Sequence, residues 1–332
     1  MKRVFTIFVL SALFILVACQ TNDSKSDENT SIKLGEVTRS LFYTPQYVAL
    51  EKDFFSDEGL DVELQTTWGG DKTMTALLAD NIDIALVGAE TSIYVYAQNS
   101  KNYAINFAQL TQTDGTFLVA KNEHPDFTWD DLKDESFLGQ RKGGMPQMVG
   151  EFVLKNHNID PHKDLYLEQN VDFANIPSAF ASDDFEFVQL FEPTASTMEK
   201  EGKGHVIASF GEESGHVPYT VFMAKDSYIT ENEDDILKFT KAIYKAQKWV
   251  QAHDPEEIAK VIAPYFDDTE LDMLTASIKR YKDQGSFAET PIFNKEGWNN
   301  LKSIMDEAGE LPEDISFEEL VDNDFAEKVV DQ

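Results

Sequence analysis

Hydrophobic positions along the chain follow two patterns, one typical of strands and the other of helices. Residues 61–68 alternate polar and apolar side chains as an extended strand does. In the segment 72–80, Met74, Leu77 and Leu78 recur at helical spacing, and Asp71 precedes them as a candidate cap. The short run 82–88 is almost entirely apolar, which is typical of a strand buried in a parallel sheet. This order predicts a βαβ unit with a right-handed crossover.

A weaker copy of this pattern occurs in the middle of the chain. Segment 179–191 repeats the order seen in 76–88, namely a short helix, an acidic turn and a strand. Each strand is followed by an acid and hydroxyls, Glu90-Thr91-Ser92 in one case and Glu192-Pro193-Thr194 in the other. We therefore expect two lobes with similar βαβ cores.

Helices dominate the C-terminal third. Helical periodicity marks residues 232–253, 255–266, 269–283 and 298–309, after a return strand that ends near residue 225. Strands that alternate with helices, followed by further helices, predict the α/β class. The simplest division puts residues 32–120 and 222–332 in lobe 1 and residues 121–221 in lobe 2, so that the chain crosses between lobes twice.

The N-terminus has the anatomy of a signal peptide. Lys2 and Arg3 precede an apolar run that ends at Ala18; at about 15 residues it is shorter than the ~20 of a membrane span. Leu16 to Cys19 resembles the lipobox of bacterial lipoproteins, which implies cleavage after residue 18 and lipidation of Cys19; the alternative is a plain secretory peptide. Residues 19–31 are polar and aperiodic, as in a flexible tether. Cys19 is the only cysteine, so no intrachain disulfide can form.

Charge and missing motifs exclude several functions. The formal net charge of −32 repels phosphate backbones, which argues against nucleic-acid binding. The glycines at 143 and 144 lack the spacing of a nucleotide-binding loop, and no hydrolase or zinc-protease motif occurs. His205 and His216 flank Glu212 and Glu213, but this spacing matches no zinc pattern. We expect no cofactor, no metal and no catalytic residue.

Four segments carry a family resemblance: 42–64, 69–88, 139–147 and 187–196. Together they resemble the periplasmic-type solute-binding proteins of ABC importers, in the branch that binds nitrate, sulfonates, taurine or thiamine-pyrimidine precursors. The resemblance implies a two-lobed periplasmic-binding-protein-like fold (type II) with a ligand cleft between the lobes. It also implies docking on an ABC transporter permease, a monomer, and a lipid anchor on the outer face of a Gram-positive-type cell membrane. Pyrimidine synthases share this fold family, but their cysteine-rich motif is absent here.

Ligands of open α/β sheets bind outside the carboxyl ends of the strands. Glycines there allow close approach of backbone N–H groups, and aromatic rings offer flat apolar faces. The competing interpretations are ordinary turns for the glycines, core packing for the tyrosines and helix capping for the acids. The candidate ligand-binding residues are Tyr43, Trp68, Gly69, Gly70, Glu90, Thr91, Ser92, Arg141, Gly143, Gly144, Glu192 and Tyr219.

The ligand class rests mainly on Glu192. A carboxylate at the end of an apolar strand is costly unless it meets water, a cation or N–H donors. Together with aromatic strand ends and few arginines, this favours a flat, nitrogen-bearing molecule such as a thiamine pyrimidine precursor. The alternative is a sulfonate, taurine or nitrate, for which Arg39 or Arg141 is a candidate ligand.

Overall fold

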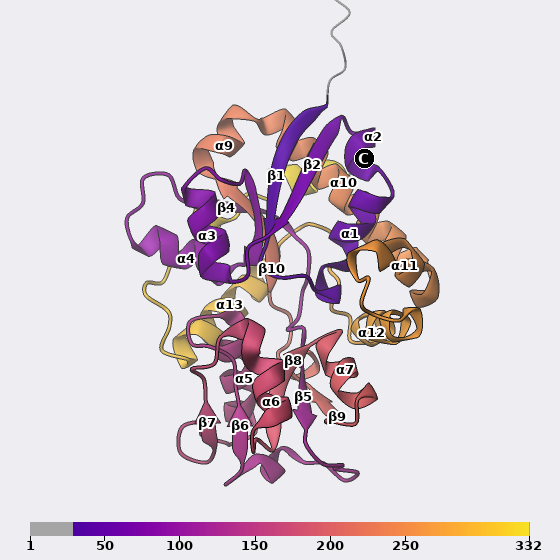
Figure 1. Cartoon of the computed structure of the whole chain (residues 1–332). Helices are drawn as coiled ribbons and strands as arrows, with labels where there is room; N and C mark the ends of the chain where they lie inside the picture. Colours follow the sequence, from indigo (N-terminus) through magenta and orange to yellow (C-terminus); the bar gives the residue numbers. More distant parts are fainter. Residues whose placement is uncertain (1–28, 332) are drawn as a thin grey trace, which may run out of the picture.

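In the computed structural model, which describes residues 29–331, the chain folds around two five-stranded sheets. They lie in the upper and lower halves of the molecule in Figure 1, and we call these halves lobe 1 and lobe 2. The expected signal peptide 1–18 and the lipidation site Cys19 lie outside the described residues. The tether was expected to continue to residue 31, but the first strand already begins at Thr30.

The sheet of lobe 1 has the strand order β2-β1-β3-β10-β4. β1 runs parallel to β2 and β3, whereas β10 is antiparallel to β3 and β4. The predicted βαβ unit is present as β2, helix α3 and β3, and β3 is almost completely buried, as its apolar run predicted. The strands are β1 (Thr30–Glu36), β2 (Leu60–Thr66), β3 (Ile84–Gly88), β4 (Ala104–Gln109) and β10 (Thr220–Lys225).

The sheet of lobe 2 has the order β7-β6-β8-β5-β9, which is the same topology as in lobe 1. β8 therefore occupies the place of β3, in agreement with the sequence repeat. The boundary expected at residue 120 is wrong, because β5 pairs with β8 and β9 and so already belongs to lobe 2. The strands are β5 (Thr116–Ala120), β6 (Ser136–Leu138), β7 (Tyr166–Glu168), β8 (Phe187–Phe191) and β9 (His205–Ser209).

Helices cover both sheets, and α10 shows how one of them is held. Its apolar face turns inward, and the ring of Phe239 packs against Phe55, Phe107 and Phe222 at centroid distances of 4.8, 5.9 and 5.0 Å. Among the helices of residues 29–331, none combines the length and hydrophobicity needed to span a bilayer. The α-helices before β10 are α1 (Thr44–Glu51), α2 (Phe54–Asp57), α3 (Gly70–Leu78), α4 (Glu90–Ala97), α5 (Met145–Asn156), α6 (Ile176–Ser182), α7 (Thr194–Lys200) and α8 (Phe210–Glu213).

The C-terminal helices contact both lobes, which differs from their predicted assignment to lobe 1. α10 and α15 pack on lobe 1, whereas α12 packs against α7 and α13 against α5 in lobe 2. These later helices are α9 (Asp226–Glu231), α10 (Glu233–Ala252), α11 (Pro255–Ile262), α12 (Leu271–Asp283), α13 (Lys295–Glu307), α14 (Phe317–Leu320) and α15 (Asp324–Val330). Short 3-10 turns lie at Leu41–Tyr43, Trp129–Leu132, Phe173–Asn175 and Ala263–Tyr265.

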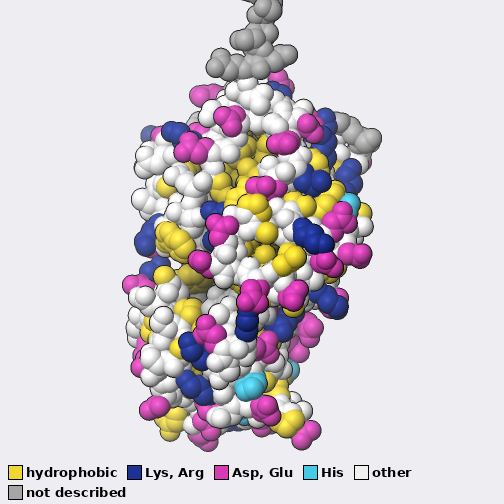
Figure 2. All heavy atoms as spheres, turned by 45° about the vertical axis from the view of Figure 1, so that its right-hand side comes forward, with side chains coloured by type: hydrophobic (Ala, Val, Ile, Leu, Met, Phe, Trp, Pro, Cys, Tyr) yellow, Lys and Arg dark blue, Asp and Glu magenta, His cyan; other side chains and the backbone are white. Residues whose placement is uncertain are grey.

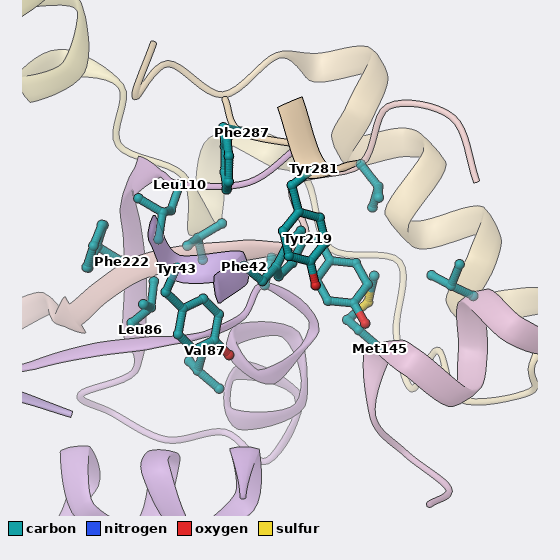
Figure 3. Close-up of a cluster of buried hydrophobic side chains, with 14 of the residues drawn as sticks. Phe42, Tyr43, Leu86, Val87, Leu110, Met145, Tyr219, Phe222, Tyr281 and Phe287 are labelled. Carbon is teal, nitrogen blue, oxygen red and sulfur yellow. The ribbon is translucent and has the colours of Figure 1, made fainter. Parts of the chain in front are cut away.

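An aromatic cluster joins the lobes, with Phe42 at its centre (Figure 3). The Phe42 ring lies 5.2 Å from Tyr281 of α12, 5.5 Å from Tyr219 and 5.9 Å from Phe191 at the end of β8. The crossing segment passes so close that a Cβ on Gly115 would lie 2.6 Å from the Phe42 ring. The hydroxyl of Tyr281 accepts a hydrogen bond from the Glu192 N–H and donates one to the Gly115 carbonyl.

We predict that Tyr281→Phe lowers the free energy of unfolding by about 1–3 kcal/mol, because it leaves a buried N–H and a buried carbonyl without their partner. Urea denaturation followed by circular dichroism measures this change. Tyr166→Phe is the matched control, since the Tyr166 side chain is 71% exposed. Equal stability of the two variants would contradict the bridging role of the Tyr281 hydroxyl.

Candidate functional site

A cavity of about 420 Å³ lies between the two lobes. Lobe 1 contributes α3, the end of β3 and α4, and lobe 2 contributes residues 140–146 with Phe173 and Phe191. In Figure 2, hydrophobic side chains gather on lobe 1 and along the line where the lobes meet. The volume falls within the ~300–1,000 Å³ typical of small-molecule sites, and such sites combine apolar walls with a few polar groups.

The structure brings most of the predicted site residues together in the wall of this cavity. Those in the wall are Tyr43, Gly69, Gly70, Glu90, Thr91, Arg141, Gly143, Gly144 and Tyr219. Trp68, Ser92 and Glu192 lie outside it, each for a different reason.

Trp68 and Ser92 have other roles. Trp68 adopts a left-handed backbone conformation with φ 62° after β2, and its side chain is 54% exposed outside the cavity wall. Ser92 is buried; its hydroxyl donates to the Ala89 carbonyl at 2.8 Å and accepts from the Asn106 amide at 2.9 Å. Ser92 therefore ties the start of α4 to β4. The prediction that these two side chains face a ligand is wrong.

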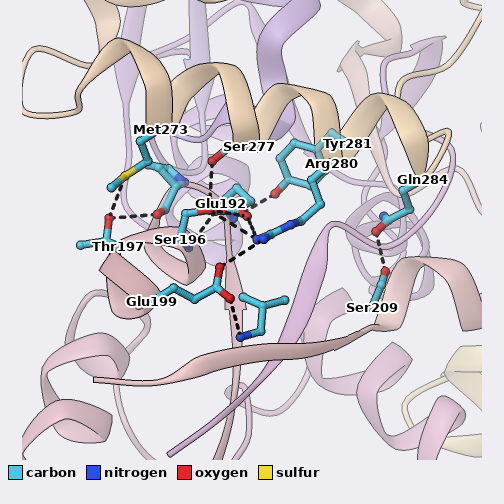
Figure 4. Close-up of polar contacts among 12 residues, drawn as sticks. Glu192, Ser196, Thr197, Glu199, Ser209, Met273, Ser277, Arg280, Tyr281 and Gln284 are labelled. Atoms are coloured by element: carbon cyan, nitrogen blue, oxygen red, sulfur yellow. Dashed lines mark hydrogen bonds and ion pairs between the residues drawn. The ribbon is translucent and has the colours of Figure 1, made fainter. Parts of the chain in front are cut away.

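Glu192 is a structural acid (Figure 4). Its carboxylate accepts hydrogen bonds from the Ser196 N–H at 3.0 Å and the Ser196 hydroxyl at 2.9 Å, and it forms an ion pair with Arg280 of α12. Arg280 also pairs with Glu199 at 3.1 Å. The expectation that Glu192 accepts bonds from a ligand is therefore wrong, because a cation 88 residues further along the chain satisfies it.

Glu90 is the equivalent acid of lobe 1, and its environment is different. The residue is 4% exposed, and its side chain folds back over Gly88, where a Cβ would lie 2.1 Å from Oε2. Oε2 has no hydrogen-bond partner among residues 29–331, and no described cation pairs with this carboxyl. Burial raises the pKa of Glu90 to about 8, although the N–H groups of Glu90 and of Met145 oppose this shift. Since Met145 begins α5, the carboxyl of Glu90 reaches across the cleft to lobe 2.

Tyr219 adds a second polar group to the same cavity. Its hydroxyl makes no hydrogen bond of normal geometry to any residue between 29 and 331. Burial first, and then the negative charge of nearby Asp114, raise the pKa of the Tyr219 phenol well above its usual value, so the hydroxyl stays protonated. Glu90 and Tyr219 thus each bring to the cavity wall an oxygen that is buried, and the Tyr219 phenol lies close enough to Asp114 for the two side chains to interact.

Part of the positive charge in the cavity wall is already compensated, because Arg141 is paired with acids, whereas no described acid forms an ion pair with Lys142. Within the described part of the chain, the basic side chains of the wall are Arg141 and Lys142. Arg141 pairs with Asp71 of α3 at 3.0 Å, across the cleft, and with Asp172 at 3.8 Å. Asp71 therefore does not cap α3, whose N-cap position is held by Gly69.

The glycine turn before α5 is also less open than the sequence suggested. Gly143 has a left-handed φ of 84°, which glycine adopts without strain. Its N–H donates to the Gln147 side-chain oxygen at 2.9 Å, so this group is not free for a ligand. The N-cap residue of α5, Gly144, has no side-chain cap.

Sequence reasoning missed the apolar residues of the cavity wall. These include Met74, Leu78, Val95, Met145 and Phe191. Their helical or strand periodicity is the same signal that marks a core face, so nothing in the local sequence distinguishes a cavity wall from packed interior.

Two α/β lobes of matching topology, joined by crossing segments around a ligand-sized cavity, define a two-lobed solute-binding protein. The chain belongs to the NMT1-like family, whose profile matches residues 25–263. It is 59% identical over 320 residues to YtlA of Bacillus subtilis (strain 168), which carries the name of a binding protein; the match covers 96% of this chain and 95% of that one.

Solved structures show the same fold. The nitrate-binding protein NrtA from Synechocystis PCC 6803 superposes with a TM-score of 0.74 at 18% identity, covering 92% of this chain and 89% of its own. The alkanesulfonate-binding protein SsuA from Xanthomonas axonopodis pv. citri, bound to MOPS, has a TM-score of 0.72 at 14% identity, and the match covers 89% of this chain and 99% of SsuA. These structures confirm the predicted fold class, and the family match and the YtlA relative agree with the prediction of a binding protein. The relative YtlA and both of these solved structures carry the names of binding proteins.

The raised pKa of Glu90 gives a prediction about stability and pH. Burial raises this pKa from 4.5 to about 8, so the folded protein keeps a proton that the unfolded chain releases. The stability contributed by Glu90 is complete below pH 4.5 and is lost as the pH rises through about 8. Glu90→Gln cannot lose this proton. The free energy of unfolding of the variant, relative to that of the wild type, should therefore increase by up to about 1.4 kcal/mol per pH unit between pH 5 and 8.

Urea denaturation of both ligand-free proteins at a series of pH values measures this difference. Burial also raises the pKa of Asp114 to about 6, but Asp114 is present in both proteins and its effect cancels in the comparison. Parallel stability curves for the two proteins would show that Glu90 titrates normally.

Proposed function

We propose that this receptor binds a flat, nitrogen-bearing small molecule, a thiamine pyrimidine precursor, with Glu90 as its principal hydrogen-bond acceptor. One observation carries the proposal: Glu90 lies in the cavity wall as a buried carboxyl with no described cation beside it and with one oxygen that has no partner among the described residues. A buried acid in this position is stabilised when a ligand brings an amine or a ring N–H to it. Glu90 takes the role that the sequence assigned to Glu192.

The aromatic walls support the same ligand class. Tyr43, Tyr219 and Phe191 line the cavity, and their rings offer apolar faces to a flat heterocycle. Glu90 in the same wall can accept a hydrogen bond from an exocyclic amine of such a ring. Capture between two lobes, followed by delivery to an ABC transporter permease, completes the proposed activity. No cofactor takes part in it.

A sulfonate, taurine or nitrate is the second candidate. Arg141 in the cavity wall favours it, as do the nitrate- and alkanesulfonate-binding proteins that share the fold. Two features weigh against an anion. Arg141 is already paired with Asp71 and Asp172, and the first N–H of α5 faces the Glu90 carboxyl. An anion would have to displace these acids.

Calorimetric titration of the Glu90→Gln variant at pH 9, above the pKa of about 8 that Glu90 has in the folded protein, separates the two ligand classes. Hydroxymethylpyrimidine, the aminopyrimidine half of thiamine, should bind the variant about ten- to over a hundredfold more weakly than the wild type, because a charge-assisted hydrogen bond is lost. Ethanesulfonate should bind the variant equally well or better, since a negative charge is removed from the cavity.

Glu63→Gln is the matched control, because it makes the same charge change on the exposed side of β2 in the same lobe. It should leave both affinities unchanged. Tight ethanesulfonate binding to the wild type, without measurable binding of the pyrimidine, would overturn the proposed ligand.

We further propose that the receptor is a lipid-anchored monomer on the outer face of the cell membrane. The sequence from Leu16 to Cys19 supports this placement, since it follows a signal-peptide apolar run. A lipid on Cys19 would hold the folded lobes beside the permease through the polar segment after it.

Cys19→Ser tests the anchor. The variant should move from the membrane fraction to the medium or remain an unprocessed precursor, because no thiol is left to accept the lipid. Incorporation of labelled palmitate, compared with the wild type, is the measurement. Labelling of the variant at the wild-type level would rule out lipidation at residue 19.

A further inference from the structure

The cavity is larger than the proposed aminopyrimidine requires. An apolar cavity of about 150 Å³ holds a benzene ring, which is similar in size to a pyrimidine. The interlobe cavity measures about 420 Å³, so a single ring beside Glu90 would leave more than half of it unfilled. The residues that line the remaining volume indicate which chemical group would fill it.

One wall of this extra volume is a single side of α3. Met74 and Leu78 are four residues apart, so both project from the same side of the helix, and both line the cavity. Met74 is buried, whereas Leu78 is 39% exposed. An apolar surface thus extends from the interior of the cleft to its mouth along one turn of α3.

A second wall is formed by α4 and the start of α5. Glu90 is the first residue of α4; Tyr94 and Gln98 follow at intervals of four along the same side, and both line the cavity. Eight residues of helix span about 12 Å from Glu90 to the mouth. The Tyr94 hydroxyl lies 3.6 Å from the Met148 sulfur of α5, so this ring closes the space toward lobe 2. Val95 and Met145 add further apolar surface.

We propose that this space is a second ligand compartment, the apolar arm, lined by Met74, Leu78, Tyr94, Val95 and Met145, and that the natural ligand carries an aliphatic or aromatic substituent there. α3 packs directly against α4, so their lining residues border one channel. A ligand whose donor group meets Glu90 directs such a substituent along α4 toward Leu78. The proposal rests on the proposed function for the position of the head group, but the arm itself depends only on its walls.

The test separates head group from chain. Three series of compounds carry chains of one to six carbons on an aminopyrimidine, on a primary amine and on a sulfonate, and each is titrated calorimetrically at constant pH and salt. In any series that binds, affinity should rise about fourfold for each added methylene until the arm is filled. Leu78→Asn should reduce this gain more for the outer carbons of the chain than for the inner ones.

Leu271→Asn is the matched control. Leu271 is 37% exposed at the start of α12 and lies outside the cavity wall, so its replacement should leave every titration unchanged. Glu90→Gln completes the design, since it should shift the affinity of a whole aminopyrimidine series without altering its dependence on chain length.

The outcomes distinguish the two proposals. If aminopyrimidines bind with an affinity that does not depend on chain length, the apolar arm is overturned and the proposed ligand class stands. If only amines or sulfonates bind, and their affinity rises with chain length, the ligand class is overturned and the arm stands. A Leu78→Asn variant with the wild-type chain-length dependence, or the absence of binding in all three series, would also overturn the arm.

Discussion

The position of the two lobes depends on how α12 is attached at the end of β8. Two neighbouring side chains of this helix bind the same residue: the Tyr281 hydroxyl accepts from the Glu192 N–H, and Arg280 pairs with the Glu192 carboxylate. Phe191, one position earlier, lines the cavity and packs against Phe42 of lobe 1. Because α11 links α12 back to α1, the C-terminal helices fix the distance between the lobes and so the height of the cleft.

The two lobes share a topology but not a chemistry. Glu90 and Glu192 follow equivalent central strands, and each carboxyl is buried. In lobe 2 the charge is balanced inside the protein by Arg280, at the usual cost of desolvating an ion pair. In lobe 1 no described cation balances it, and burial raises the pKa instead. Only the lobe 1 wall of the cavity therefore carries a carboxyl without a described cation beside it, and this asymmetry would give a bound ligand a defined orientation.

Local patterns in the sequence predicted the elements well. The apolar run 82–88 is β3, the spacing of Met74 and Leu77 marks the buried face of α3, and Gly59 ends the α1–α2 region with a left-handed φ of 78°. Several site residues could also be predicted, because strand ends converge in this class of sheet. The errors concern ion pairs between residues far apart in the sequence. The residues around Glu192 do not indicate that it pairs with Arg280, and those around Asp71 do not indicate that it pairs with Arg141. The apolar wall residues could not be separated from the core, since burial against a ligand and burial against protein produce the same periodicity.

The order of strands has a consequence for synthesis. Every strand of the lobe 2 sheet comes from one continuous stretch, Thr116 to Ser209, whereas lobe 1 must wait for β10 to fill the gap between β3 and β4. A chain that emerges N-terminus first can thus complete its second sheet before its first. Until residue 225 is available, β3 and β4 each present an unpaired edge, which is the kind of surface on which nascent chains aggregate. Lobe 1 begins the chain but is the last to complete its sheet. Its exposed strand edges remain unpaired for the time needed to translate lobe 2, which is inserted within it.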